Sequence, residues 1–571
     1  MSQISCPLHQ QKTKAEDQNI SFEGWYEKGK RAWLRGAALV SLMVYVLSYL
    51  GVRTGSISAG NAWLLCILST VVIFIGTFHF YSISVRSKFT NIQSLSTSNN
   101  KRIPVHGIFR TLFDILMKPG TLLRDIDVQR MHKLGDIYLM LIGFRPAVVV
   151  TSAALSEKIS RSYDDFAKSD PRELNMPFFF QWVGNNNVVL ANGDSWRRIR
   201  ELTHYPLNEI HIFAPVFNQK ARVLCDSIRN IVEKGEDNDK KGVEVNLSRW
   251  LKAVSLDSAG EALFGYNFNH LNEESNPGID AMDYIINEIF DPMRIAFPIK
   301  NRLPLKSNHR LRESMKHLDG LVMDMIDHIN NDKSSRSNNN VLEMLIRGQQ
   351  SDVLNANELR NNIIAMVLAS HETTQVSFGG VLYYLAKFPE LQENLRKDAL
   401  ALFPDLDAAL SRLDMSKENK KDDTYQKLRR FDSMENFILE SLRLYSPLAN
   451  QNARTTTQDT ELGGYHIPKG TLVVMNIHAV HMNSSEWNSP ETFNPERFEN
   501  STNKFAYLPF GAGPRICSGR NFSLMEQKIV LCHLLRYFRI ELPFSDYTVP
   551  LRRGSFTGIP DASFRLRFTL I

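Results

Sequence analysis

The sequence has 571 residues, 43% of them hydrophobic and 22% charged, and a formal net charge of +6. It can bury a large core in one or several domains, and its mildly basic balance is compatible with acidic surfaces or partners. Its five cysteines are scattered and odd in number, which argues against a disulfide framework and a zinc site and suits a reducing compartment. Glycine-rich nucleotide motifs and arginine–aromatic stretches are missing, so we expect no nucleic-acid partner.

The N-terminal region divides into a tail, an apolar segment and a linker. Residues 1–31 are polar and lack a signal-peptide pattern. Residues 32–81 contain two charge-free runs, Gly36–Val52 with 17 residues and Ala62–Tyr81 with 20. At 1.5 Å per residue, the second run can cross about 30 Å of hydrocarbon, whereas the first barely can. Residues 82–103 are rich in Ser, Thr and Asn, which is typical of a linker.

The two apolar runs are open to three arrangements: a buried pair of core helices, a membrane hairpin, or a single span with the other run lying in the membrane interface. Basic residues flank the outer ends of both runs, among them Arg35 and Arg86. Because such residues favour the cytosolic side, a hairpin places both outer ends there. We therefore predict an N-terminal membrane anchor of one or two transmembrane helices, with the large domain cytosolic.

Residues 104–571 have the pattern of one globular domain. Helical periodicity dominates from about Pro215, and short β-prone runs precede and follow it. The predicted fold class is therefore mainly α with a small β region. The expected strands cover residues 136–143, 146–150, 472–475 and 563–569, and the expected helices include 153–159, 434–444 and 521–531.

The run from Phe510 to Gly519 places one cysteine, Cys517, in a loop with three glycines and a proline. A thiolate is a strong ligand for haem iron and favours O–O cleavage. Glycines allow backbone N–H groups to approach the sulfur and permit left-handed turns, and the following helix N-terminus keeps a thiolate ionised. Arg515 can reach a haem propionate. The alternative is a lone buried cysteine behind a glycine turn.

Two helical segments before this loop carry polar groups that suit a haem site. Trp196 and Arg200 are four residues apart on one helix face, where either Asp194 or Ser195 could cap the helix, and both can donate to a carboxylate. The alternative is an amphipathic surface helix. In the second segment, the Thr373 hydroxyl can bond the carbonyl of Ala369, loosen the helix and open a groove for O2 and water. The alternative is an ordinary polar helix end.

A further pair, Glu440 and Arg443, is three residues apart on one helix face, and a Pro-rich segment with Arg497 follows. An exposed helix ion pair is the alternative and would contribute little. Arg454 opens a strand–turn–strand segment. We expect His481 to lie at a turn without a ligand role.

Together these segments give F-x-x-G-x-R-x-C-x-G at Phe510–Gly519, W-x-x-x-R at Trp196, E-x-x-R at Glu440 and P-E-R-F around Arg497. Over residues 104–571 the chain resembles the cytochrome P-450 family in the order and spacing of these motifs. The resemblance implies a triangular-prism fold with haem b between the Thr373 helix and the Cys517 loop. One departure is Ser370, which stands where the family's (A/G)-G-x-(D/E)-T motif has glycine.

The resemblance also implies residue roles. Cys517 would bind the iron, Thr373 would orient a proton-delivering water, and Glu372 would supply protons from solvent. Glu440, Arg443 and Arg497 would pin the segment beneath the haem loop. The haem-binding residues implied are Trp196, Arg200, Arg454, Phe510, Gly511, Arg515 and Gly519, and position alone suggests Phe180, Val189, Ala369, Asn450 and Phe556 for the substrate pocket.

The implied reaction is a monooxygenation of a small, largely apolar metabolite with O2, in which two electrons come from NADPH through a separate reductase, with cytochrome b5 as a further partner. The general look is fungal, which suggests a peptide-derived substrate of secondary metabolism or the cell wall, while sterols and fatty acids stay open. With the predicted anchor, the expected location is the endoplasmic reticulum membrane. Two alternatives are a reductase-independent isomerase or dehydratase and a non-catalytic haem-binding protein. The candidate surface for an acidic partner comprises Arg197, Arg198, Arg520 and Lys528, for which ordinary surface charge is the alternative.

Overall fold

The computed structural model describes residues 103–104 and most of 123–571, together with eight single positions between Arg35 and Gly76. The gaps after residue 123 are 143–144, 175, 236–241, 274–276, 292–293, 295–297, 332–339, 412–422, 501, 552–557 and 559. The predicted tail, nearly all of the two apolar runs and nearly all of the linker lie outside the described residues. Within the part described, no helix has the length and apolarity needed to span a membrane.

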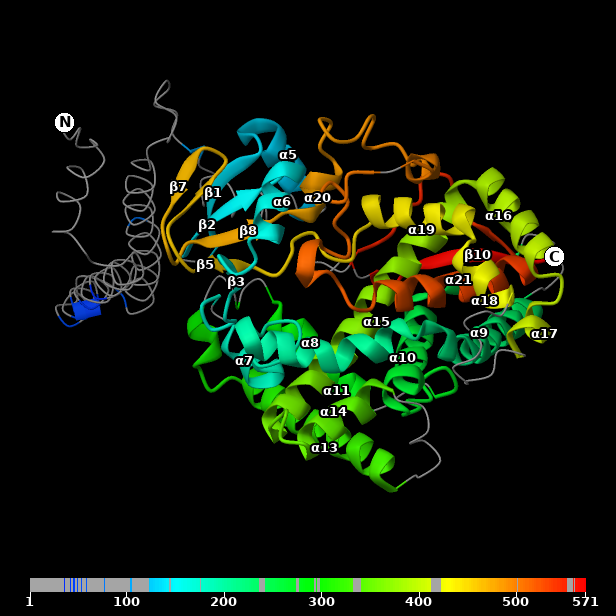
Figure 1. Cartoon of the computed structure of the whole chain (residues 1–571), viewed down its shortest axis with the longest axis horizontal. Helices are drawn as coiled ribbons and strands as arrows, with labels where there is room; N and C mark the ends of the chain where they lie inside the picture. Colours follow the sequence, from blue (N-terminus) through cyan, green and yellow to red (C-terminus); the bar gives the residue numbers. More distant parts are fainter. Residues whose placement is uncertain are drawn as a thin grey trace, which may run out of the picture.

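Helices form most of the described chain (Figure 1). The longer ones are α8 (Gly193–Asn208), α9 (Ala214–Gly235), α10 (Ser248–Phe264), α11 (Pro277–Ile289), α13 (Lys306–Asn331), α15 (Ala356–Lys387), α16 (Pro389–Leu402), α19 (Asp432–Leu444) and α21 (Arg520–Tyr537). The shorter ones are α5 (Leu123–Leu134), α6 (Ala153–Arg161), α7 (Pro177–Val183), α14 (Val341–Gln350), α17 (Leu406–Ser411), α18 (Asp423–Arg429) and α20 (Ile477–His481), with 3-10 turns η2 (Ile210–Ile212), η3 (Pro298–Asn301), η6 (Pro495–Phe498) and η7 (Gly513–Arg515).

The β-structure is small and lies mainly at the end of the molecule where the described chain begins (Figure 1). One sheet has the order β1-β2-β8-β5-β3, a second has β4-β10-β9, and β6 and β7 form a hairpin. The strands are β1 (Ile137–Ile142), β2 (Arg145–Val150), β3 (Phe166–Lys168), β4 (Val243–Asn246), β5 (Arg454–Thr456), β6 (Thr460–Leu462), β7 (Tyr465–Ile467), β8 (Leu472–Met475), β9 (Phe538–Glu541) and β10 (Arg565–Leu570). Strand β2 lies between β1 and β8, and both of its faces are buried, because Val148 and Val150 pack in one hydrophobic cluster and Ala147 and Val149 in another.

Helix α15 organises the helical body. It has 32 residues, most of them buried, and it packs against α10 and α19. A capping box fixes its start: the Asn355 side chain accepts from the Glu358 N–H, and the Glu358 carboxylate accepts from the Asn355 N–H. Arg198 of α8 donates to the Glu358 carboxylate at 2.6 Å and to the Val353 carbonyl, which ties α8 to this helix start.

The predicted fold class, mainly α with a small β region, is confirmed, and the elements expected at β1, β2, β8, β10, α6, α19 and α21 are present within a few residues. The predicted cap of α8 is wrong. The helix begins one residue after Asn192, and Asp194 lies in its first turn, where its carboxylate accepts from Arg197 at 2.6 Å. An acidic group at that position still favours the helix N-terminus, because it faces the positive end of the helix dipole.

Candidate active site

The Cys517 loop is a closed turn held by its own backbone. The Cys517 N–H donates to the Phe510 carbonyl at 2.9 Å, and Gly511 and Gly513 both have φ of +70°. The N–H groups of Gly519 and Arg520 donate to the Cys517 sulfur at the start of α21. The loop therefore has the left-handed glycines and the backbone donors that the sequence predicts for a thiolate.

The Cys517 side chain is exposed, in contrast to the buried Cys225 and Cys532. Protein atoms nevertheless crowd around the sulfur, and this desolvation raises the pKa of its thiol. The Gly519 and Arg520 N–H groups and the Arg200 guanidinium act in the opposite direction. Burial raises the pKa of Cys532 to about 12 against the opposing charges of Arg536 and Lys528, and burial is also the main cause that raises the pKa of Cys225 further still. All three cysteines have a cation nearby, but among them Cys517 is the one whose sulfur also accepts backbone N–H groups, which favour a thiolate.

Gly513 lies where the loop packs closely against α6. A Cβ at residue 513 would lie 2.6 Å from the Ser160 carbonyl oxygen of α6, and its φ is unfavourable for other residues. We therefore expect Gly513→Ala to move the loop and lower haem content several-fold, measured as bound haem per chain. Gly464→Ala, at a turn with φ of +81° and no atom near the added Cβ, is the matched control for backbone strain without a clash. Equal haem in both variants would contradict a tightly seated loop.

Cations from four elements gather beside the loop. The Arg515 guanidinium lies 4.4 Å from the centre of the Trp196 ring and donates to the Ala191 carbonyl at 2.8 Å. Arg200 of α8 donates to the Ser518 hydroxyl. Arg454 is buried at the start of β5, where it donates to the Phe166 carbonyl at 3.0 Å while its Nε has no hydrogen-bond partner among the described residues. The three arginines and the tryptophan predicted from the sequence are thus neighbours.

Lys168, which sequence reasoning missed, pairs with Arg454 across β3 and β5. Burial, followed by the charges of Arg454 and Arg515, lowers the pKa of Lys168 well below its ordinary value. Burial, then the neighbouring Arg454 and Arg200, lowers the pKa of Arg515 to about 9, and burial lowers that of Arg454 to about 10. No motif marks Lys168 in the sequence, because only the strand pairing brings it here.

These four basic residues, Lys168, Arg200, Arg454 and Arg515, are called the cation cluster below. Within the described residues none of them has an ion pair with a carboxylate, although burying like charges together is costly without anions. The two propionates of a haem would supply those anions, and an unpaired Arg454 Nε would gain an acceptor. The residues present therefore fit a haem, whose propionates the cation cluster would hold.

On α15, the Thr373 hydroxyl donates to the Ala369 carbonyl at 2.8 Å, as predicted. Ala369 is exposed, while most of α15 is buried. The predicted loosening is not observed, because α15 is α-helical without interruption. Ser370 donates to the Val367 carbonyl at 3.2 Å, so its extra hydroxyl is satisfied within the helix. Glu372 is buried beside Thr373.

His371 is buried next to these residues. It bonds the Val367 carbonyl through Nδ1 at 2.7 Å, and burial lowers its pKa to about 4, so it is neutral. A short polar link then joins α15 to the helix of the cysteine loop. The hydroxyls of Thr374 and Ser523 are 3.3 Å apart, and Ser377 donates to Gln527 at 2.7 Å. The predicted oxygen-side helix and the predicted thiolate helix are therefore in direct contact.

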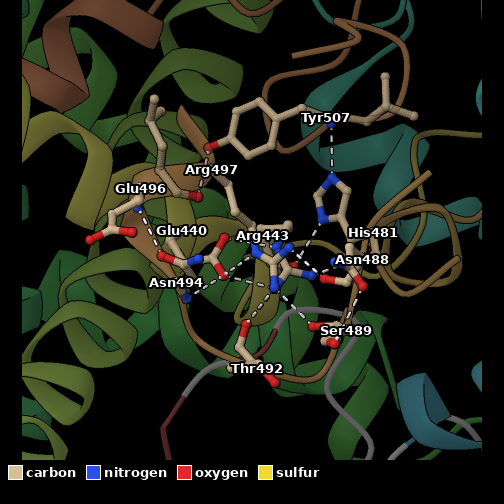
Figure 2. A network of polar contacts seen from close by, with 12 residues as sticks. Glu440, Arg443, His481, Asn488, Ser489, Thr492, Asn494, Glu496, Arg497 and Tyr507 are labelled. Atoms are coloured by element: carbon tan, nitrogen blue, oxygen red, sulfur yellow. Dashed lines mark hydrogen bonds and ion pairs between the residues drawn. The ribbon is translucent and has the colours of Figure 1, made fainter. Parts of the chain in front are cut away.

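Glu440, Arg443 and Arg497 form one buried network, as predicted (Figure 2). Arg443 donates to both Glu440 oxygens at 2.8 Å, and neither side chain is exposed. Arg497 donates to Glu440 at 3.3 Å and to the Ser489 carbonyl at 2.9 Å. The network thus pins the segment from Asn488 to Arg497 against α19.

The residues predicted to line the substrate pocket lie in different local environments. Phe180 of α7 packs under Arg172, 4.0 Å from ring centre to guanidinium carbon. Val189 is half-buried and its carbonyl accepts from Arg515 at 3.3 Å, which places it beside the cation cluster. Asn450 is half-buried in a bridge to Asn476. Ala369 is described above, and Phe556 lies outside the described residues.

The four cations predicted to form a partner surface do not all belong to one. Lys528 is buried in α21, where it pairs with Glu435 at 2.7 Å and donates to the Leu428 carbonyl at 3.0 Å. Arg198 pairs with Glu358 at the start of α15, and Arg197 pairs with Asp194. Sequence reasoning failed here because a lysine in a helix looks the same whether its amine reaches solvent or a neighbouring helix end.

Comparisons with known proteins show which family the sequence matches. The sequence model of the family described as cytochrome P-450 matches residues 104–563, starting where the sequence predicts the globular domain to start. The chain is 29% identical to cytochrome P-450 3A5 of Homo sapiens over 476 residues, covering 78% of this chain and 89% of that protein. It is 26% identical to cytochrome P-450 3A6 of Oryctolagus cuniculus over 449 residues, covering 75% and 84% respectively.

Proposed function

Because the chain belongs to the cytochrome P-450 family, we propose that Cys517 is its thiolate ligand and that Glu372 and Thr373 deliver protons on the opposite side of the haem. The family binds haem b through a cysteine thiolate, and its members are monooxygenases that use O2, redox partners and small-molecule substrates. The chain is therefore a haem-thiolate monooxygenase. When bound, the haem supplies the O2 chemistry.

One observation carries the residue assignment: the exposed Cys517 sulfur with its two backbone donors lies beside Arg200 and the rest of the cation cluster. In this proposal Arg200, Arg454, Arg515 and Lys168 hold the propionates, together with the Trp196 indole. The loop residues Phe510, Gly511 and Gly519 keep the sulfur in place. Thr373 holds a water through its hydroxyl, and the buried Glu372 passes protons to that water.

The proposed substrate is a compact, largely apolar metabolite with amide or hydroxyl groups, and peptide-derived compounds of secondary metabolism or the cell wall are the first class to test. The support is the exposed Ala369 on α15 and the amide-bearing Asn450. The electron donor we propose is a separate NADPH-dependent reductase, with cytochrome b5 as an additional partner. A panel of such metabolites should be screened for a substrate-induced shift of the haem spectrum. Incubation with reductase, NADPH and isotopically labelled O2 should then place one labelled oxygen atom in the product; turnover that needs no reductase would overturn this assignment.

Thr373→Ala is expected to lower product formed per NADPH by about 10²-fold, because the water loses its hydroxyl partner. Thr373→Ser keeps the hydroxyl and is the matched control. Haem content and the substrate-induced spectral shift should be unchanged in both variants. Equal product yield from the alanine and serine variants would remove Thr373 from proton delivery.

We also propose that residues 32–81 attach the enzyme to the endoplasmic reticulum membrane, with the catalytic domain in the cytosol. The support is the pair of charge-free runs and four helical positions in the first run, Leu42, Tyr45, Val46 and Tyr49, which are all exposed. Their i, i+3, i+4, i+7 spacing puts them on one face of a helix. Release of the full chain from membranes by alkaline extraction would contradict the anchor.

A further inference from the structure

His481 is a buried histidine outside the predicted site, and its two ring nitrogens join two segments of main chain (Figure 2). Its Nδ1 lies 2.9 Å from the carbonyl oxygen of Arg443, at the end of α19. Its Nε2 lies 2.8 Å from the backbone nitrogen of Leu508, at the start of the cysteine loop. Because a carbonyl can only accept and an N–H can only donate, Nδ1 carries the proton and Nε2 does not.

A second set of contacts fixes the same ring. Tyr507 stacks on the His481 imidazole with ring centres 5.7 Å apart, and its hydroxyl donates to the Leu439 carbonyl of α19 at 3.0 Å. The His481 carbonyl in turn accepts from the Arg443 guanidinium at 2.9 Å. The Glu440–Arg443–Arg497 network is thus connected through His481 to Leu508 and Tyr507, which are nine and ten residues before Cys517.

We propose that His481 is a positioning residue for the thiolate loop: the neutral imidazole holds the Leu508 backbone at a fixed place relative to α19, and the loop carries this position to the Cys517 sulfur. The inference rests on the proposed role of Cys517. Through His481, the Glu440–Arg443–Arg497 network reaches the main chain that leads into the loop. The bonds of Arg497 do not reach it, because they end on residues 488–492.

The link requires an uncharged ring, because protonation of Nε2 would replace its acceptor with a second donor facing the Leu508 N–H. The groups that face the ring favour the neutral form. The Arg443 cation is adjacent, Glu440 is already paired with Arg443 and Arg497, and the half-buried Tyr507 has a pKa raised well above its ordinary value by desolvation. Burial, followed by the Arg443 charge, lowers the pKa of His481 from 6.5 to about 3.

The lowered pKa of His481 in the folded chain determines how stability changes with pH. Between about pH 6.5 and pH 3 the unfolded chain binds a proton at residue 481 and the folded chain does not. The contribution to stability is present above that window and is lost as the pH falls through it, by about tenfold in the unfolding constant per pH unit.

The test uses the full chain with haem and compares His481→Gln and His481→Leu with wild type. Glutamine offers a donor and an acceptor without titrating in this range, so it should keep the reduced, CO-bound Soret band of thiolate-ligated haem at pH 7. Wild type should lose that band at a higher pH than H481Q on acidification. H481L should exchange the Leu508 amide hydrogen at least tenfold faster and hold less thiolate-ligated haem.

His533→Gln is the matched control, because His533 is also buried with its pKa lowered to about 4 but bonds Asn218 instead of the loop. H533Q should change overall stability without changing Leu508 exchange. Unchanged Leu508 exchange in H481L would overturn the proposal; if H481L does not fold, equal acid sensitivity of the band in wild type and H481Q would overturn it instead. Absence of the band in wild type would instead contradict the role of Cys517.

Discussion

Cys517→Ser is expected to remove the thiolate-ligated form of the enzyme and all oxygenase activity. Serine preserves the size of the side chain and the loop geometry, but its hydroxyl stays protonated near neutral pH and cannot replace a thiolate as an axial ligand. The Gly519 and Arg520 N–H groups and Arg200, which favour an anion at residue 517, would then face a neutral oxygen. The reduced, CO-bound spectrum measures this loss directly.

Cys532→Ser is the control for that substitution. Cys532 lies in α21, the helix that follows the loop; it is buried and has a pKa raised to about 12, so it is a packed thiol. Its replacement should cost about 1 kcal/mol of stability and leave the thiolate spectrum intact. A C517S protein with a full thiolate band would transfer the ligand role to another cysteine.

Arg443→Ala is expected to prevent stable haem incorporation. The Glu440 carboxylate would lose its bidentate partner in a site that solvent does not reach, keeping only Arg497 at 3.3 Å and the Asn494 N–H at 2.9 Å. Removing one partner of a buried ion pair costs roughly 3–5 kcal/mol. That is a large part of the stability of a typical protein. Bound haem per chain and the urea midpoint measure the two consequences.

Arg229→Ala provides a matched comparison, because Arg229 pairs with Asp226 at the same i,i+3 spacing in α9, where both partners are partly exposed. That pair should contribute under about 1 kcal/mol, so the variant should keep its haem. Full haem content in Arg443→Ala would show that the network does not support the loop.

The sequence predicted correctly the features that depend on residues close together in the chain. The glycines of the Cys517 loop need a special backbone, the 434–444 segment has the apolar period of a helix, and the Glu440–Arg443 spacing places both side chains on one face. These features depend on residues a few positions apart, and the structure shows them with small shifts of boundary.

The features that sequence missed depend on distant pairing. Lys168 joins the cation cluster only because β3 pairs with β5, and His481 bridges residues on either side of it in sequence by 38 and 27 positions. The prediction that Lys528 belongs to an exposed partner surface was wrong, because its amine contacts the end of α18 and Glu435 instead of solvent. The expected loosening at Thr373 also failed, because one side-chain bond to Ala369 does not displace the backbone bonds of a 32-residue helix.

The cation cluster has a consequence for the life of the protein in the cell. A chain without porphyrin holds these like charges together, so its fold is self-repelling, and binding of the cofactor pulls the equilibrium toward the compact form. Haem supply would accordingly set how much of the enzyme survives quality control.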